Sequence, residues 1–320
     1  MAVDDHRLAA GRCDGCGVKI AESGVGENMD LLERTIVHAR GDIGPDQHAA
    51  GKGRRVGIVA QAEHRRRANA EQRRGEVAAI RERFGDLPML LAGMVGSTVG
   101  WRVVPYVAAP AGIDELVAGL DWIDDRTAIV PGVSCSQNGR ADVMRGEEVQ
   151  LLGAVAGWMS PPDALLVQPG THCKWATMAG GRITGFTTAM TGELFALLRG
   201  HSLLAGSLTA EVTDGDAFRE GLAEGARRDL AASLFGIRAA SVLGLRDDAD
   251  AASFASGVLI GADVTARMDD CAFEQIHILA DPALGNLYAT AVAATGREPV
   301  IVDSHSAFAR GILAIGDNAL

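Results

Sequence analysis

Three apolar segments in a row, followed by a regular exchange of helices and strands, constrain the fold of this chain more than any other feature. Residues 164–168, 174–179 and 182–187 have the pattern of strands, and Gly180-Gly181 between the last two indicates a two-residue hairpin. Helices are expected next at 191–199, 214–243 with a break, and 250–268. The chain should close with strand, helix, strand and helix at 276–280, 283–295, 299–302 and 306–315. This order predicts a mixed sheet with helices on its faces, an α/β fold.

The segment before residue 164 has a similar pattern from about residue 77. An amphipathic helix at 77–84 precedes a short buried strand at 89–92. A helix at 112–120, a strand at 127–130 and an amphipathic helix at 147–159 should follow. Because 320 residues with 48% apolar content exceed an ordinary single domain, we expect two lobes.

The first eighty or so residues differ in character from the rest. Phe84 is the first aromatic residue, although the chain contains 8 Phe, 4 Trp and 2 Tyr. Arginine-rich stretches in this region show no sustained apolar period, and only short patches such as 56–60 have the pattern of strands. A basic segment without aromatic residues contributes little to a core. We therefore expect residues 1–76 to be poorly packed.

Charge and apolar content exclude several classes of protein. The net charge of -11 argues against a nucleic-acid surface, because phosphate contacts need clustered Lys and Arg, but it does not exclude a small anionic substrate. No apolar run approaches the roughly 20 residues that span a bilayer, and the first residues lack the pattern of a signal peptide. We expect a cytoplasmic protein with no membrane partner.

The five cysteines are odd in number and mostly scattered, which is typical of reduced thiols. Cys13 and Cys16 form a CxxC pair, but no second pair or suitably spaced histidines accompany it. This is a weak signal for zinc. The sequence leaves the residues of any metal site open.

A glycine loop between two predicted strands carries several hydrogen-bond donors. Gly170 lets backbone N–H groups approach a ligand, and Thr171, His172 and Lys174 supply side-chain donors. Such a loop suits phosphate. A tight hairpin with solvated polar residues would have the same sequence pattern.

A second glycine-rich loop follows the strand at 89–92. The candidate substrate residues here are Gly93, Met94, Gly96, Ser97 and Trp101. Sugars are held by hydroxyl and amide hydrogen bonds beside an aromatic wall, which this loop offers. The alternative is a simple turn with Trp101 in the core. No Gly-Lys-Ser or Gly-Lys-Thr follows, so the loop is not a P-loop.

Two carboxylates lie in the first turn of the helix at 147–159. Glu147 and Glu148 follow Arg145 directly after Gly146. Acidic residues at a helix start commonly only complement the helix dipole. A kinase that phosphorylates an alcohol needs one carboxylate to accept the hydroxyl proton, and positive charge for an acidic substrate.

These three segments, in this order, resemble the 2-dehydro-3-deoxygalactonokinase family. Two further strings do so as well: 189–198 with His201-Ser202, and 256–262. The resemblance extends from about residue 77 to the C-terminus. It implies a two-lobed actin-like (ribonuclease H-like) ATPase fold with ATP between the lobes and Mg²⁺ on the phosphates. It also implies phosphoryl transfer to the 6-hydroxyl of 2-dehydro-3-deoxy-galactonate, in galactonate catabolism.

The resemblance assigns roles by position. The loop with Gly170, Thr171, His172 and Lys174 becomes the second phosphate loop, and 93–101 with Arg145 becomes part of the sugar site. Glu147 takes the place of the catalytic base, with Glu148 in reserve. Gly261 and Asp281 fall on the nucleotide side, although relatives have glycine after the strand at 276–280 where this chain has Asp281-Pro282.

The N-terminal region departs from the family. Relatives begin with a strand that ends in Asp-x-Gly-Thr-Thr, the first phosphate loop, and this chain has no such motif. We hypothesise that residues from about 5 to 76 are an out-of-frame or otherwise replaced segment. The expected division is an atypical segment 1–76, the rest of an incomplete first lobe at 77–160, and a second lobe at 161–320.

Two other functions remain open at this point. One is a catalytically impaired or non-catalytic member of the fold that binds ligand, because the first of the two phosphate loops is missing. The other is a kinase of a different sugar acid. A homodimer is also left open, since the sequence does not determine the oligomeric state.

Overall fold

The computed structural model describes residues 10–12, 18–21, 36–39, 57–62, 70–137, 139–269 and 271–320. Cys13, Cys16 and most of the segment 1–76 lie outside these residues, so the expectation of poor packing there stays a prediction. The chain divides into two compact units. Unit 1 contains the described residues up to Met159, with 181–184 and 305–320, and unit 2 contains 160–180 and 185–304. The division at residue 160 that the sequence suggests stays a prediction as well.

Unit 1 is built on a seven-stranded sheet of order β1-β2-β3-β4-β5-β8-β7. Its strands are β1 (Ala10–Arg12), β2 (Val18–Ala21), β3 (Ile36–Ala39), β4 (Gly57–Ala62), β5 (Met89–Gly93), β7 (Asp121–Asp124) and β8 (Thr127–Ile129). β4, β5 and β8 run parallel, whereas β1 to β4 form an antiparallel meander. The predicted strands at 89–92 and 127–130 are confirmed, and every residue of β5 and β8 is buried.

A smaller sheet and four α-helices complete the part of unit 1 that the structure describes. The sheet has the order β10-β9-β6, with β6 (Val107–Ala108), β9 (Val133–Gln137) and β10 (Arg140–Met144). The helices are α1 (Ala70–Phe84), α2 (Ile113–Ala118), α3 (Glu147–Ala156) and α9 (Ser304–Ala319). The predicted helices at 77–84, 112–120, 147–159 and 306–315 are thus confirmed, with shifted ends.

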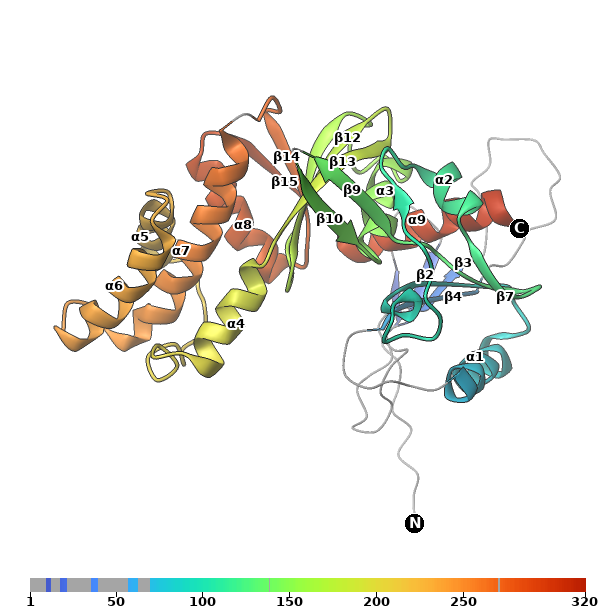
Figure 1. Cartoon of the computed structure of the whole chain (residues 1–320), viewed down its shortest axis with the longest axis horizontal. Coiled ribbons are helices and arrows are strands. Elements are labelled where there is room, and N and C mark those ends of the chain that lie inside the picture. Colours follow the sequence, from blue (N-terminus) through green and yellow to red (C-terminus); the bar gives the residue numbers. More distant parts are fainter. Residues whose placement is uncertain are drawn as a thin grey trace, which may run out of the picture. The chain divides into compact units, whose positions relative to one another are not determined.

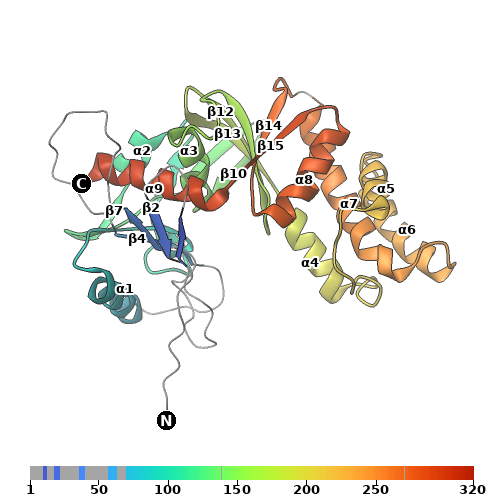
Figure 2. The ribbon, with the colours of Figure 1, turned by 180° about the vertical axis from the view of Figure 1, so that it is seen from behind.

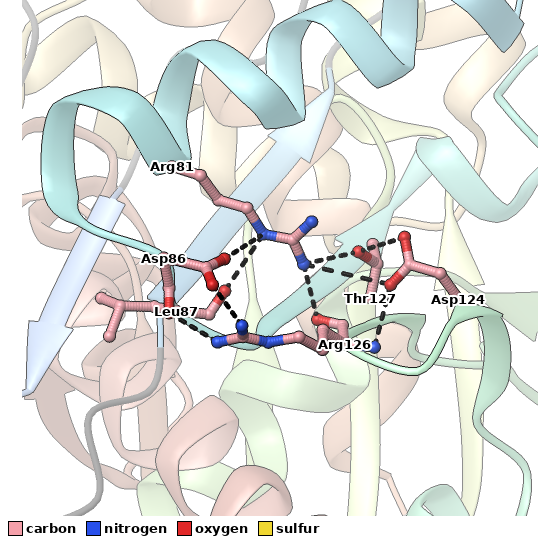
Figure 3. A network of polar contacts seen from close by, with 6 residues as sticks. All are labelled: Arg81, Asp86, Leu87, Asp124, Arg126 and Thr127. Atoms are coloured by element: carbon pink, nitrogen blue, oxygen red, sulfur yellow. Dashed lines mark hydrogen bonds and ion pairs between the residues drawn. The ribbon is translucent and has the colours of Figure 1, made fainter.

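A polar network fastens α1 to the sheet (Figure 3). Arg81 on α1 donates to the carbonyl oxygens of Leu87 at 3.2 Å and Arg126 at 3.0 Å, and to Thr127 Oγ1 at 3.0 Å. Arg126 in turn forms an ion pair with Asp86. Arg81 thus connects α1 to the segment before β5 and to the start of β8.

α3 and α9 lie side by side in both views (Figures 1 and 2), and two glycines explain how closely. A Cβ atom on Gly153 would lie 1.9 Å from the carbonyl oxygen of Ala307, and one on Gly311 would lie 1.9 Å from that of Val149. No side chain fits at either place. The backbones of the two helices therefore touch, and the last helix of the chain supports the helix that begins at Glu147.

Unit 2 contains a five-stranded sheet of order β13-β12-β11-β14-β15. Its strands are β11 (Ala164–Gln168), β12 (Cys173–Ala179), β13 (Arg182–Ala189), β14 (Gln275–Leu279) and β15 (Glu298–Val302). β11, β14 and β15 are parallel, and β12 pairs antiparallel with β11. The predicted hairpin is confirmed, because Gly180 and Gly181 have φ of 56° and 75°, as a type I′ turn requires.

Five helices accompany this sheet: α4 (Thr191–His201), α5 (Asp216–Gly225), α6 (Leu230–Val242), α7 (Asp248–Met268) and α8 (Pro282–Ala294). The predicted break within 214–243 is confirmed. α5 and α7 pack backbone against backbone, because a Cβ atom on Gly221 would lie 2.2 Å from the Phe254 carbonyl oxygen. One apolar cluster joins β11, β12 and β14 to α5, α7 and α8.

Among the residues that the structure describes, no helix is long and apolar enough to cross a membrane.

Candidate functional site

β5 ends in a glycine loop that is closed by its own hydrogen bonds. Gly93 has φ 87° and ψ -148°, a backbone region that favours glycine. Met94–Gly96 form a single 3-10 turn, η1. Ser97 then folds back, because its N–H and its Oγ both donate to the Met94 carbonyl oxygen, at 3.0 and 2.7 Å. The predicted substrate loop is therefore a fixed turn at the end of a buried strand.

The start of α3 lies directly against this loop. Gly146, which precedes the helix, has φ 107°, and a Cβ atom on it would lie 3.0 Å from the Cα atom of Gly93. The structure thus brings together two groups of predicted site residues, the glycine loop and the acidic helix start. Both are parts of unit 1.

Arg145 is buried beside the loop, with only 9% of its surface exposed. Its Nη2 donates to the Val104 carbonyl oxygen at 2.7 Å, and its Cζ lies 4.2 Å from the centre of the Tyr106 ring, a cation–π contact. Its Nε and Nη1 atoms are buried without an acceptor among the described residues. Unpaired buried donors are costly, so the guanidinium has capacity for an anion.

The two carboxylates at the start of α3 differ sharply in their surroundings. Glu148 is fully buried, and both its oxygens accept from the Gly146 N–H, at 2.7 and 2.8 Å. Burial, and then the negative charge of Glu147, raise the pKa of Glu148 to about 8. Glu147 is only half-buried, and its Oε2 accepts from the Arg145 N–H at 2.9 Å. With a pKa of about 8, Glu148 is mostly protonated at neutral pH and is therefore poorly suited to act as a base.

Trp101 packs against the core of unit 1. It is half-buried against a cluster that contains Val95, Val104 and Ile129. Its backbone N–H donates to the Val95 carbonyl oxygen at 2.7 Å. Packing alone accounts for this aromatic residue, and its predicted role as a sugar-facing wall stays a prediction.

In unit 2 the loop from Gly170 to Lys174 leads from β11 into β12 and includes the first two residues of that strand, Cys173 and Lys174. A Cβ atom on Gly170 would meet nothing within 4 Å, and Thr171 and His172 are exposed. An open glycine flanked by exposed donors fits an anionic group such as phosphate.

The first turn of α4 holds this loop in place. The Glu193 N–H donates to the Thr171 carbonyl oxygen at 2.9 Å, and Glu193 Oε2 lies 2.6 Å from His172 Nε2. A Cβ atom on Gly192 would lie 2.3 Å from the Gly170 carbonyl oxygen. The Thr-Gly-Glu sequence therefore positions the loop by direct backbone contact.

Lys174 does not extend from the loop into solvent. Its side chain is buried, with 4% of the residue exposed, and its Nζ donates to Thr188 Oγ1 on β13 at 2.9 Å. Its predicted contact with phosphate stays a prediction.

The two remaining nucleotide-side predictions fall on other elements of unit 2. Gly261 is inside α7, where a Cβ atom would lie 2.5 Å from the Leu222 carbonyl oxygen, so close packing with α5 explains its glycine. Asp281 is exposed and caps α8 through its carbonyl oxygen, which accepts from the Gly285 N–H at 2.8 Å. The nucleotide contacts of both residues stay predictions.

Sequence reasoning missed Asp263, a buried carboxylate on α7 that accepts hydrogen bonds from Trp175 and Thr191, beside the loop from Gly170 to Lys174. A signal was present, since an acid stands between Ile260 and Val264 on the apolar face of a helix. No group of three or more His, Cys, Asp or Glu residues suited to a metal was found within the described ranges. Mg²⁺ in kinases commonly needs only one or two carboxylates besides substrate phosphates.

Comparisons with known proteins agree on one family. The sequence model of the family described as 2-keto-3-deoxy-galactonokinase matches residues 43–315. The chain is 40% identical over 230 residues to the 2-dehydro-3-deoxygalactonokinase of Escherichia coli strain K12, which covers 71% of this chain and 78% of that protein. It is 32% identical over 249 residues to a protein of Rhizobium meliloti provisionally given the same name, covering 75% and 81%.

A solved structure is similar as well. The crystal structure of a protein from Sinorhizobium meliloti, provisionally described as a 2-dehydro-3-deoxygalactonokinase, matches with a TM-score of 0.71 at 32% identity. The match covers 77% of this chain and 84% of that one.

Proposed function

This chain belongs to the 2-keto-3-deoxy-galactonokinase family, and on that premise we propose that it transfers the terminal phosphoryl group of ATP to the 6-hydroxyl of 2-dehydro-3-deoxygalactonate. The resemblance inferred from the sequence is confirmed: the chain is a sugar-acid kinase, a transferase of carbohydrate metabolism. One observation supports the reaction most. The backbone contact between Gly93 and Gly146 gathers a glycine loop, a buried arginine and two carboxylates at the end of one strand.

We propose that Glu147 accepts the proton of the attacking hydroxyl. The half-buried position of this carboxylate at the start of α3 supports the role, as does the high pKa of its neighbour Glu148, which keeps that residue protonated. Glu148 is assigned a structural role, because both its oxygens accept from the Gly146 N–H.

We propose that Arg145 binds the carboxylate of the sugar acid. The support is the pair of buried guanidinium nitrogens that have no acceptor among the described residues. A planar guanidinium suits a carboxylate, since two N–H groups can donate in parallel. Gly96 leaves room for this side chain, because a Cβ atom there would lie 2.8 Å from Nη1.

We propose that the loop from Gly170 to Lys174 holds the nucleotide phosphates. Its open glycine and exposed Thr171 and His172 fit a phosphate by their donor chemistry. ATP supplies the phosphoryl group when bound, and Mg²⁺ would arrive with its phosphates. The order of the unit 2 sheet, a three-strand meander followed by two parallel strands, supports a two-lobed actin-like fold.

A coupled ADP-release assay over several sugar acids tests the proposal. We expect ADP release with 2-dehydro-3-deoxygalactonate to exceed that with its C4 epimer and with galactonate. A higher kcat/KM with another acid would make the chain a kinase of a different substrate. Ligand binding without ADP release would make it a non-catalytic member of the family. The cytoplasmic location and the homodimer stay predictions.

A further inference from the structure

Asp263 is a carboxylate inside the apolar core of unit 2. Only 8% of the residue is exposed, and its neighbours include Trp175, Tyr288 and Val264. Burial raises the pKa of its carboxyl above the ordinary value, and hydrogen bonds from Trp175 and Thr191 oppose that rise. An acid in such surroundings costs stability, and an apolar residue of similar size would avoid the cost.

Several side chains donate hydrogen bonds to this carboxylate. Trp175 Nε1 lies 3.1 and 3.2 Å from its two oxygens, and Thr191 Oγ1 lies 3.1 Å from Oδ2. The hydroxyl of Tyr288 on α8 is more distant, at 3.4 Å from the same Oδ2, and the Cys173 thiol also interacts with the carboxylate. An indole N–H can only donate, and a carboxylate offers enough lone pairs to accept from all of these groups.

Two of these donors flank the loop from Gly170 to Lys174. Trp175 is the first residue after it on β12, and Thr191 is the first residue of α4. The next two residues of α4 make the backbone contacts to the loop described above, at the carbonyl oxygens of Gly170 and Thr171. A single carboxylate thus holds both the strand that leaves the loop and the helix that supports it.

We propose that Asp263 is a positioning residue for the phosphate loop, which it fixes by holding Trp175 and Thr191 together. It touches no substrate. The inference rests on the proposed function only for what the loop binds, since the effect on loop geometry is independent of any ligand.

Amide hydrogen exchange on the full chain without nucleotide tests the geometry. The informative amides are those of Thr171 to Lys174 and that of Glu193, which bonds to the Thr171 carbonyl oxygen. In Asp263→Asn these amides should exchange about tenfold faster, the factor expected for losing one charge-assisted hydrogen bond. The amide of Ile278 on the neighbouring β14 should be unchanged.

Tyr288→Phe is the comparison variant: it removes the more distant donor, at 3.4 Å on α8, and should accelerate loop exchange less than Asp263→Asn does. If Asp263→Asn fails to fold, Thr191→Val provides the same readout by removing one donor while the carboxylate stays. Unchanged loop exchange in the variant that folds, or equal acceleration at Ile278, overturns the proposal.

ATP titration of the same variants separates this inference from the proposed function. Faster loop exchange with weaker ATP binding supports both. Faster loop exchange with unchanged ATP affinity supports the positioning role of Asp263 but contradicts the phosphate role of the loop. ATP titration of Thr171→Val tests that phosphate role independently.

Discussion

A Cβ atom on Gly146 would lie 3.0 Å from the Cα atom of Gly93, so the start of α3 and the end of β5 meet with no side chain between them. Gly146 also has φ 107°. Two separate constraints therefore select glycine here: the backbone conformation and the space available.

A left-handed conformation costs an ordinary residue about 1 to 2 kcal/mol. Gly146→Ala should destabilise the protein by more than this amount. Gly139→Ala is the control, because Gly139 has φ 74° but open space around it. Denaturant unfolding of both variants isolates the cost of the contact with Gly93. An equal loss of unfolding free energy in both variants would mean that the contact with Gly93 does not affect stability.

Glu147→Gln should lower kcat by about 10²- to 10⁴-fold, because the general base is lost while the size of the side chain is kept. KM for the sugar acid should change little. Glu148→Gln is the matched control at the next position, and it should leave most of the turnover intact. The ADP-release assay measures both, and a larger loss at Glu148 would reassign the base.

Stability should fall as pH rises because of Glu148. Its pKa in the folded protein is about 8, above the ordinary value of 4.5, so between these values the folded state holds a proton that the unfolded state has released. The free energy of unfolding then decreases by up to about 1.4 kcal/mol per pH unit over that range.

Glu148→Gln should remove this component. Urea unfolding of the parent and the variant from pH 5 to pH 9 measures it, and the variant should gain most relative to the parent near pH 8 and above. Parallel profiles for the two proteins would show that Glu148 is not protonated in the folded state.

Lys174→Ala should weaken ATP binding by about tenfold or more, the effect of losing a charge-assisted hydrogen bond to phosphate. Thr188→Val is the control, since it removes the hydroxyl that accepts from Nζ but keeps the cation, and it should change the affinity less. Equilibrium titration with ATP measures both. If Lys174→Ala binds ATP with the same affinity as the parent, Lys174 does not contact the phosphates.

The sequence predicted most of the fold where apolar pattern and turn chemistry agree. The strands at 164–168 and 182–187 and the hairpin between β12 and β13 were found in this way. β7, β9 and β10 were not, because β7 alternates between half-buried and exposed residues and most residues of β9 and β10 are not fully buried. Such short strands have no sustained apolar period.

Residue types alone indicated the parts of the candidate site but not the contacts among them. The glycine loop after β5, the acidic start of α3 and the loop from Gly170 to Lys174 were proposed in this way. The hydrogen bond from Trp175 to Asp263 joins residues 88 positions apart. The difference in burial between Glu148 and Glu147 is likewise set by tertiary packing. Neither has a local signature in the sequence.

The backbone contact between α3 and α9 at Gly153 and Gly311 bears on the order in which the protein folds during synthesis. Unit 1 includes α3 and residues 305–320, whereas most of unit 2 lies between them in the sequence. Because α9 is synthesised after α3 and after unit 2, unit 2 can become native on the nascent chain while the helix that bears Glu147 still lacks its support. We expect pulse proteolysis during synthesis to find unit 2 resistant first, with resistance of α3 appearing only after α9 has emerged from the ribosome. Competence for catalysis would then depend on the emergence of α9.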